Sequence, residues 1–160
     1  MVENEGLQFY KDDSEVHLSD IDDGLGLTPE ILIVDDEIYN VEALKVMLTH
    51  IGIDVERYCT VAMNGEQAVK EVKGAHIRGE RFKLILMDCN MPFMDGYQAT
   101  KLIREFLTEV RGEQPVITAV TDHHEQEYVD RCIEVGMNNV FTKPARLALL
   151  KALLTKIRII

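Results

Sequence analysis

The 160-residue chain is poor in cysteine, in basic side chains and in long apolar runs, and each shortage narrows its possible function. Its three cysteines, Cys59, Cys89 and Cys132, have neither the paired spacing of a disulfide framework nor the spacing of a metal-binding motif. Buried, reduced thiols are therefore the favoured interpretation. With 17 basic and 28 acidic residues the formal net charge is −11, which argues against a nucleic acid as a direct partner.

No apolar run approaches the length needed to cross a bilayer, and the acidic start lacks the layout of a signal peptide. We therefore expect a cytoplasmic protein without membrane insertion. The charge is uneven, because residues 1–28 hold eight acids and one base and so carry −7 of the net charge of −11. This composition is typical of an acidic tail or linker, and we expect the folded domain over residues 29–160.

Short apolar runs alternate with amphipathic segments along the rest of the chain. The predicted strands are 31–34, 55–62, 84–87, 116–120 and 140–142. The predicted helices run from Ile38 to near Gly52, from Asn64 to Gly74, onward from Asp95-Gly96, over 125–135 and over 147–159. Such alternation predicts an α/β fold with a doubly wound, five-stranded parallel sheet and helices on both faces. Periodicity alone does not give the strand order.

Polar residues stand where the predicted strands end. Asp35 and Asp36 follow the first strand, Asp88 the third, Thr121 the fourth and Lys143 the fifth. Parallel strands end at one edge of the sheet, which is where ligands bind in such folds. Carboxylates gathered there repel one another unless cations balance them. Lys143 supplies one positive charge, and oxygen ligands of this kind favour Mg²⁺ for the rest.

A carboxylate, a hydroxyl, a lysine and Mg²⁺ are the parts needed for phosphoryl transfer. Asp88 would attack phosphorus and become an acyl phosphate. Singly, each residue has a commoner structural role: Asp35 or Asp36 as a helix cap, Thr121 as a strand-end hydroxyl and Lys143 as a solvated side chain. Their joint placement at matching strand ends favours the functional interpretation.

Together these motifs resemble a response-regulator receiver domain over about residues 30–160, and most closely the receivers of hybrid histidine kinases. The resemblance is carried by Asp35-Asp36-Glu37, Met87-Asp88-Cys89-Asn90-Met91-Pro92, Thr121 and Lys143-Pro144. It implies the flavodoxin-like strand order 2-1-3-4-5. It also implies a domain that switches by Mg²⁺-dependent phosphorylation in a two-component His-to-Asp phosphorelay.

The resemblance also assigns a metal site. It implies that Asp88 is the phosphoacceptor and a metal ligand, and that Asp36 binds Mg²⁺ directly. Asp35 is expected to bind the metal through water, and the backbone carbonyl of Asn90 is a further expected ligand.

By the same resemblance, Thr121 and Lys143 are expected to contact the phosphoryl oxygens, and the Lys143–Pro144 peptide bond is expected to be cis. The implied partner is a histidine kinase or a histidine phosphotransfer protein. A weak or phosphorylation-dependent dimer is a further expectation. The domain is expected to act as a signalling phosphoacceptor, taking part only in its own phosphorylation and dephosphorylation.

Two alternatives stay open. A phosphohydrolase of the haloacid-dehalogenase type also uses an aspartyl nucleophile and Mg²⁺, but it carries a second aspartate two residues later, where this chain has Asn90. A pseudo-receiver would bind partners without phosphorylation. Asp122 keeps that alternative open, because relatives have a small residue there and a carboxylate facing the site would repel a phosphodonor. Val140 stands where relatives often have an aromatic residue.

Overall fold

The computed structural model describes residues 30–160, so the predicted acidic tail at 1–28 lies outside the described residues. Strands and helices alternate along the described chain. In order they are β1 (Ile31–Val34), α1 (Ile38–Ile51), α2 (Val55–Tyr58), β2 (Cys59–Ala62), α3 (Gly65–Ile77), β3 (Leu84–Asp88), α4 (Gly96–Glu109), β4 (Val116–Thr121), α5 (Gln126–Val135), β5 (Asn139–Thr142) and α6 (Leu147–Lys156). Within residues 30–160, no helix is long and apolar enough to cross a membrane.

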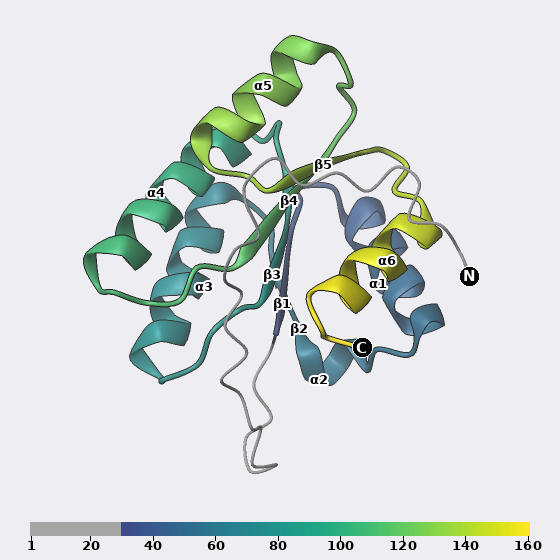
Figure 1. Cartoon of the computed structure of the whole chain (residues 1–160), viewed down its shortest axis with the longest axis horizontal. Coiled ribbons are helices and arrows are strands. Elements are labelled where there is room, and N and C mark those ends of the chain that lie inside the picture. Colours follow the sequence, from purple (N-terminus) through teal and green to yellow (C-terminus); the bar gives the residue numbers. More distant parts are fainter. Residues whose placement is uncertain (1–29) are drawn as a thin grey trace.

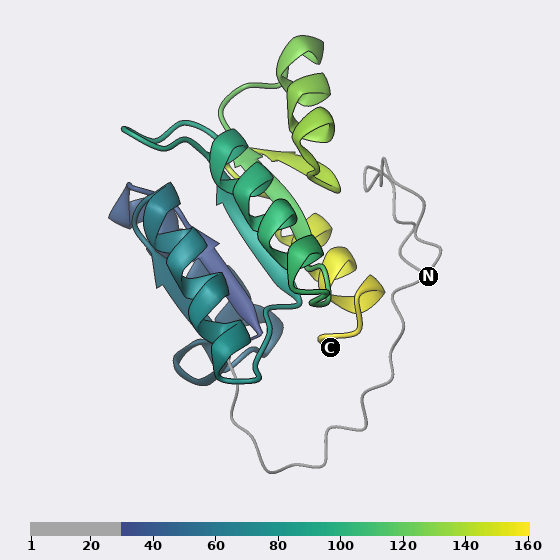
Figure 2. The ribbon, with the colours of Figure 1, turned by 90° about the vertical axis from the view of Figure 1, so that its left-hand side faces the viewer.

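The strands form one parallel sheet in the order β2-β1-β3-β4-β5, which confirms the expected fold class and strand order. Figure 1 shows α1 and α6 on one face of the sheet and α3, α4 and α5 on the other. Figure 2, turned by 90°, shows α3 in front of the β1–β2 side and α4 in front of the β3–β4 side. The sheet is therefore covered on both faces.

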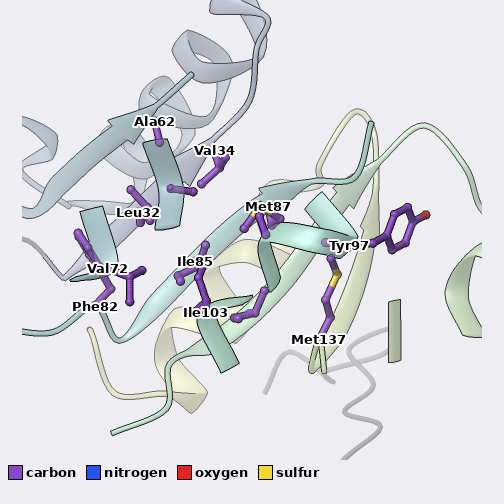
Figure 3. Close-up of a cluster of buried hydrophobic side chains, with 14 of the residues drawn as sticks. Leu32, Val34, Ala62, Val72, Phe82, Ile85, Met87, Tyr97, Ile103 and Met137 are labelled. Atoms are coloured by element: carbon purple, nitrogen blue, oxygen red, sulfur yellow. The ribbon is translucent and has the colours of Figure 1, made fainter. Parts of the chain in front are cut away.

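The central strands are buried on both faces because their side chains alternate between two apolar clusters. In β1, Ile31 and Ile33 pack with the cluster that contains α1 and α6 residues. Leu32 and Val34 pack with the cluster under α3 and α4, where Figure 3 shows Leu32 and Val34 near Ala62 and Ile85. Each fully buried side chain of this size contributes about 1.5–3 kcal/mol, so the uninterrupted runs anchor the strands.

Capping residues fix where the helices begin and end. Gly52 and Gly136 close α1 and α5 in the left-handed conformation, which glycine adopts at little cost. The Asn64 side chain accepts a hydrogen bond from the backbone N–H of Gln67 at the start of α3. These ends agree with the sequence prediction.

Three predicted boundaries were wrong. The last helix, predicted to reach residue 159, ends at Lys156. Residues 55–58 form the short helix α2, because the Asp54 side chain accepts from the backbone N–H of Arg57 and caps a helical turn, so β2 begins only at Cys59. Gly74 does not end α3, which continues to Ile77. Burial of Ala75 in the core outweighs the roughly 1 kcal/mol that a glycine costs inside a helix.

Helix α4 begins directly against the end of β3. The backbone N–H of Gly96 donates to the carbonyl of Cys89 at 2.9 Å. A side chain at position 96 would overlap the carbonyl oxygen of Asp88, so only glycine fits there without a backbone shift. The close approach therefore ties the position of Asp88 to the first turn of α4.

We expect Gly96→Ala to lower the free energy of unfolding by about 2 kcal/mol or more, because the added methyl group collides with backbone that the sheet holds in place. Urea denaturation measures the change. The matched control is Gly74→Ala in α3, where the nearest atom is the flexible end of Arg78 at 3.1 Å. That variant should gain about 0.5–1 kcal/mol from helix propensity. Equal stability changes in the two variants would contradict the close approach at Gly96.

Candidate functional site

The register of the sheet brings the predicted site residues to one edge. Val34 pairs with both Ala62 and Met87, so the residues that follow Val34 and Met87, Asp35 and Asp88, end neighbouring strands at the same level. Thr121 pairs with Thr142, and Lys143 follows at the end of β5. Non-local pairing therefore assembles a group that is spread over more than 100 residues of sequence.

Asp35 is buried, and both oxygens of its carboxylate accept hydrogen bonds. Its Oδ1 accepts from the backbone N–H of Glu37 at 2.8 Å and from the side-chain amide of Asn40 at 3.4 Å. Its Oδ2 accepts from Lys143 Nζ at 3.0 Å. Asp35 thus holds the first turn of α1 and also faces the site, so the structural and functional interpretations of this residue both apply.

Asp88 lies beside Asp35 and shares its cation. Lys143 Nζ lies 3.2 Å from Asp88 Oδ1, so one ammonium group bridges the two buried carboxylates. The Lys143 side chain is 13% exposed, and the Lys143–Pro144 peptide bond is cis, as expected. The opposite oxygen of Asp88 makes no hydrogen bond within the described part of the chain, which leaves it available to a ligand.

The surroundings shift the protonation of both partners. Burial, followed by repulsion from Asp35, raises the pKa of Asp88 from 3.8 to about 6, and the opposing pull of Lys143 only partly offsets this rise. Burial lowers the pKa of Lys143, but its hydrogen bond to Asp35 and the charge of Asp88 outweigh burial, so the net shift is upward. The site therefore holds more negative charge than its lysine balances.

The donor set fits a divalent cation. Carboxylate oxygens of Asp35, Asp36 and Asp88 lie within 4.8 Å of one another. Three carboxylates against the single charge of Lys143 leave two negative charges, which one Mg²⁺ would neutralise. Asp36 is partly exposed and Asn90 is exposed, so both predicted ligands lie on the open side of the group. The predicted metal ligands Asp35, Asp36 and Asp88 are therefore brought together.

Thr121 is buried at the end of β4, and its hydroxyl oxygen accepts from the backbone N–H of His123 at 3.2 Å. The His123 ring stacks on Tyr128 with ring centroids 4.2 Å apart, so its side chain is held against α5. Asp122 is exposed. This position favours the interpretation in which the Asp122 carboxylate faces solvent and does not repel a phosphodonor.

The sequence of residues 31–155 matches the family of response regulator receiver domains. This chain belongs to that family. It therefore is a receiver domain of two-component signalling, and the phosphohydrolase alternative is set aside because neither the fold nor the family match supports it.

Among curated relatives, the osmosensing histidine protein kinase SLN1 of Saccharomyces cerevisiae is 35% identical over 136 residues, covering 84% of this chain. The match spans only 10% of that kinase. The receiver domain of the histidine kinase CKI1 from Arabidopsis thaliana, solved with Mg²⁺ and BeF₃⁻, is 27% identical with a TM-score of 0.69. That match covers 81% of this chain and 89% of the CKI1 chain.

A Saccharomyces cerevisiae co-crystal structure joins the histidine phosphotransfer signalling protein Ypd1 to the receiver domain of its downstream response regulator Ssk1. It contains a chain that is 28% identical with a TM-score of 0.63, covering 81% of this chain and 86% of that one. The likeness to CKI1 and to this structure supports a receiver fold close to those of hybrid kinases and phosphorelay regulators.

Sequence reasoning missed one feature beside the site. Cys89, directly after Asp88, contacts Cys132 of α5 with the two Sγ atoms 3.7 Å apart. The pair is separated by 43 residues, so no local spacing pattern indicated it. Because successive side chains of a strand point to opposite faces, Cys89 could have been predicted to point away from Asp88 and into the core. The same rule could not have predicted that Cys132 is its neighbour.

We expect the stability advantage of Asp88→Asn over the wild type to grow as pH rises from about 4 to about 6 in the presence of a chelator. The folded protein keeps the Asp88 proton to higher pH than the unfolded chain does, so deprotonation lowers the free energy of unfolding across this window. Asparagine stays neutral and escapes that loss, on the order of 1–3 kcal/mol at pH 7. Urea denaturation at several pH values measures it, and a difference that is constant with pH would contradict the raised pKa.

Proposed function

We propose that this domain accepts a phosphoryl group on Asp88 from a phosphohistidine in a Mg²⁺-dependent His-to-Asp phosphorelay. The observation that carries the proposal is the arrangement of Asp35 and Asp88, two buried carboxylates bridged by Lys143, at the ligand-binding edge of a receiver sheet. Asp88 is the central member, since its carboxylate has one oxygen engaged by Lys143 and the other available.

In the proposed transfer, the available Asp88 oxygen attacks phosphorus. An oxygen–phosphorus bond forms as the phosphorus–nitrogen bond of the phosphohistidine breaks, and the departing imidazole nitrogen keeps the electron pair. The pKa of about 6 leaves Asp88 mostly ionised at neutral pH, which the attack requires. Lys143 already lies within hydrogen-bond distance of Asp88, and Thr121 ends the neighbouring strand, so both are proposed to donate to the phosphoryl oxygens.

Asp35, Asp36, Asp88 and the backbone carbonyl of Asn90 are the proposed holders of Mg²⁺. When bound, the ion supplies positive charge to the transferring phosphoryl group and offsets the repulsion between that group and the carboxylates. Asp35 keeps its place through the Glu37 backbone and Asn40, so the site is already arranged before any ligand arrives.

Loss of the phosphoryl group to water would return the domain to its starting state. Between the two states, Thr121 would exchange part of its interaction with the His123 backbone for a phosphoryl oxygen, which would move the loop at 122–125 and the start of α5. A pseudo-receiver would undergo neither step. The predicted cytoplasmic location, the lack of a nucleic-acid partner and a phosphorylation-dependent dimer stay predictions.

The proposed phosphodonor is a histidine phosphotransfer protein or a histidine kinase, as in the Ypd1–Ssk1 pair. Apolar side chains lie exposed around the acidic edge: Tyr39 at the start of α1 is 74% exposed, and Phe93 in the loop after Asp88 is fully exposed. Exposed apolar side chains beside a site are typical of a protein-binding surface. They would seat the partner with its phosphohistidine over Asp88.

The proposal predicts that acetyl phosphate with Mg²⁺ adds one phosphoryl mass to the chain, and that Asp88→Asn abolishes the addition. A chelator should abolish it as well, because the carboxylates then repel the donor without compensation. Intact mass spectrometry measures both results. The matched control is Asp95→Asn, a nearby carboxylate at the N-cap of α4, where asparagine keeps the capping function. Labelling that persists in Asp88→Asn would sink the assignment, and no labelling in any protein would favour the pseudo-receiver.

We expect Tyr39→Ser to slow phosphoryl transfer from phosphorylated Ypd1 about tenfold, a loss of about 1.4 kcal/mol of contact energy. Labelling by acetyl phosphate, which needs no protein surface, should be unchanged. Rapid-quench measurement of transfer gives the rate. Ile77→Ser is the control, because Ile77 is 83% exposed but ends α3 at the opposite edge of the sheet. Equal slowing by both variants would remove the support for a docking surface at α1.

A further inference from the structure

Two buried thiols touch directly behind the proposed phosphorylation site. Cys89 Sγ and Cys132 Sγ lie 3.7 Å apart, and neither residue has exposed surface. Cys89 follows Asp88 in the chain, and Cys132 lies in α5. The third cysteine, Cys59, is only partly buried and lies in β2, the outermost strand on the side of the sheet away from β5. The pair is therefore a distinct feature that connects α5 to the site.

We propose that Cys89 and Cys132 form an oxidisable dithiol that hydrogen peroxide converts into a disulfide, which ties α5 to the chain beside Asp88. The proposed oxidant is a small peroxide because both sulfur atoms are enclosed, and a bulky disulfide would not reach them.

The pair lies in a mainly apolar cluster in which Tyr97 carries a polar group. Tyr97 is 3% exposed, and among the described residues its hydroxyl has no hydrogen-bond partner. The Arg131 guanidinium covers the Tyr97 ring, 4.0 Å from its centroid. Cys89, Tyr97 and Cys132 belong to the same buried cluster, and burial, and after it the two thiols, raise the pKa of Tyr97. The Tyr97 hydroxyl in this cluster would serve as a donor to an oxygen formed on one of the sulfur atoms.

Helix α5 gives a route for the oxidant. Cys132 is the only buried residue of its ten, so few buried side chains hold this helix on the domain. Elements with little buried apolar contact open locally at lower free energy than the core does. Opening of α5 would admit hydrogen peroxide to Cys132 and Cys89 without unfolding the sheet.

The chemistry balances with one peroxide for each disulfide. One thiol, as its thiolate, attacks a peroxide oxygen; a sulfur–oxygen bond forms, the oxygen–oxygen bond breaks, and the hydroxide released takes a proton to become water. The second thiol then attacks the sulfenic sulfur. The sulfur–sulfur bond forms, the sulfur–oxygen bond breaks, and a second water leaves with the remaining proton. Two thiols lose two electrons in total, and the peroxide gains them.

The disulfide would change the geometry behind Asp88, and this consequence rests on the proposed function. A disulfide bond is about 2.05 Å long, so the sulfur atoms must approach from their present 3.7 Å. The Cys89 backbone is held by its hydrogen bond from Gly96, so α5 is the part that moves. Because α5 follows the loop that begins after Thr121, the tether would restrain the same segment that phosphorylation is proposed to move.

The test counts thiols after treatment of the reduced full chain with hydrogen peroxide in the presence of a chelator. After quenching with catalase and denaturation, maleimide labelling and intact mass report the free thiols. We expect wild type to lose two of its three thiols and two hydrogen masses, with a Cys89–Cys132 peptide that dithiothreitol separates. Cys59→Ser should lose both of its thiols in the same way, and Cys132→Ser should form no intramolecular disulfide. Cys132→Ala replaces Cys132→Ser if circular dichroism shows that the serine variant is unfolded.

Peroxide that oxidises Cys59 first, or that leaves the buried pair reduced until the protein unfolds, would overturn the proposal. The Asp88→Asn variant should form the disulfide as wild type does. The disulfide proposal is therefore tested even if the phosphorylation proposal fails. Oxidised wild type should accept phosphoryl from acetyl phosphate at a rate different from that of the reduced protein, and dithiothreitol should reverse the change. Cys132→Ala should show no such change, and identical rates in reduced and oxidised wild type would overturn the coupling to Asp88.

Discussion

Asp35 and Asp88 are two buried carboxylates that share one ammonium group, and the rest of the domain must hold them together against their mutual repulsion. Burial and mutual repulsion oppose ionisation of Asp88, and Lys143 only partly offsets them. Left to side-chain freedom alone, such a group would separate. It stays together because the apolar side chains of β1 and β3 fix the two strands side by side, so the hydrophobic core opposes the electrostatic repulsion at the sheet edge.

The same opposition explains why the site suits a charged ligand. A metal-free site with two uncompensated negative charges is destabilised, and a bound cation relieves the repulsion between the carboxylates. Binding energy then goes into ligand affinity, because the protein has already met the cost of assembling the carboxylates during folding. Gly96 belongs to this arrangement, since it lets α4 start against the carbonyl of Asp88 and so ties the end of β3 to the first turn of that helix.

The fold and the site were predictable where the signal is local. The uninterrupted apolar run at 84–87 indicates a strand buried on both faces. A functional role for Asp88 at its end could be predicted only together with the polar residues at the ends of the other strands. Helix ends were predicted wrongly where burial outweighs the local helix propensity. For example, α3 continues past Gly74 because Ala75 is buried in the core. The orientation of Asp122 and the contact of Cys89 with Cys132 depend on chain segments packed together from a distance, and no spacing in the sequence encodes them.

Alternation along the backbone links the two chemistries of this edge. Successive residues of an extended chain point in opposite directions, so Asp88 turns toward the acidic site while Cys89 turns into the core under α5. Only one peptide unit separates the carboxylate of the proposed phosphoacceptor from the thiol of the proposed redox pair. Any covalent change at either side chain acts on that shared backbone, which Gly96 and the β3–β4 pairing hold with little freedom to relax. Coupling between the two sites therefore requires no long pathway through the domain.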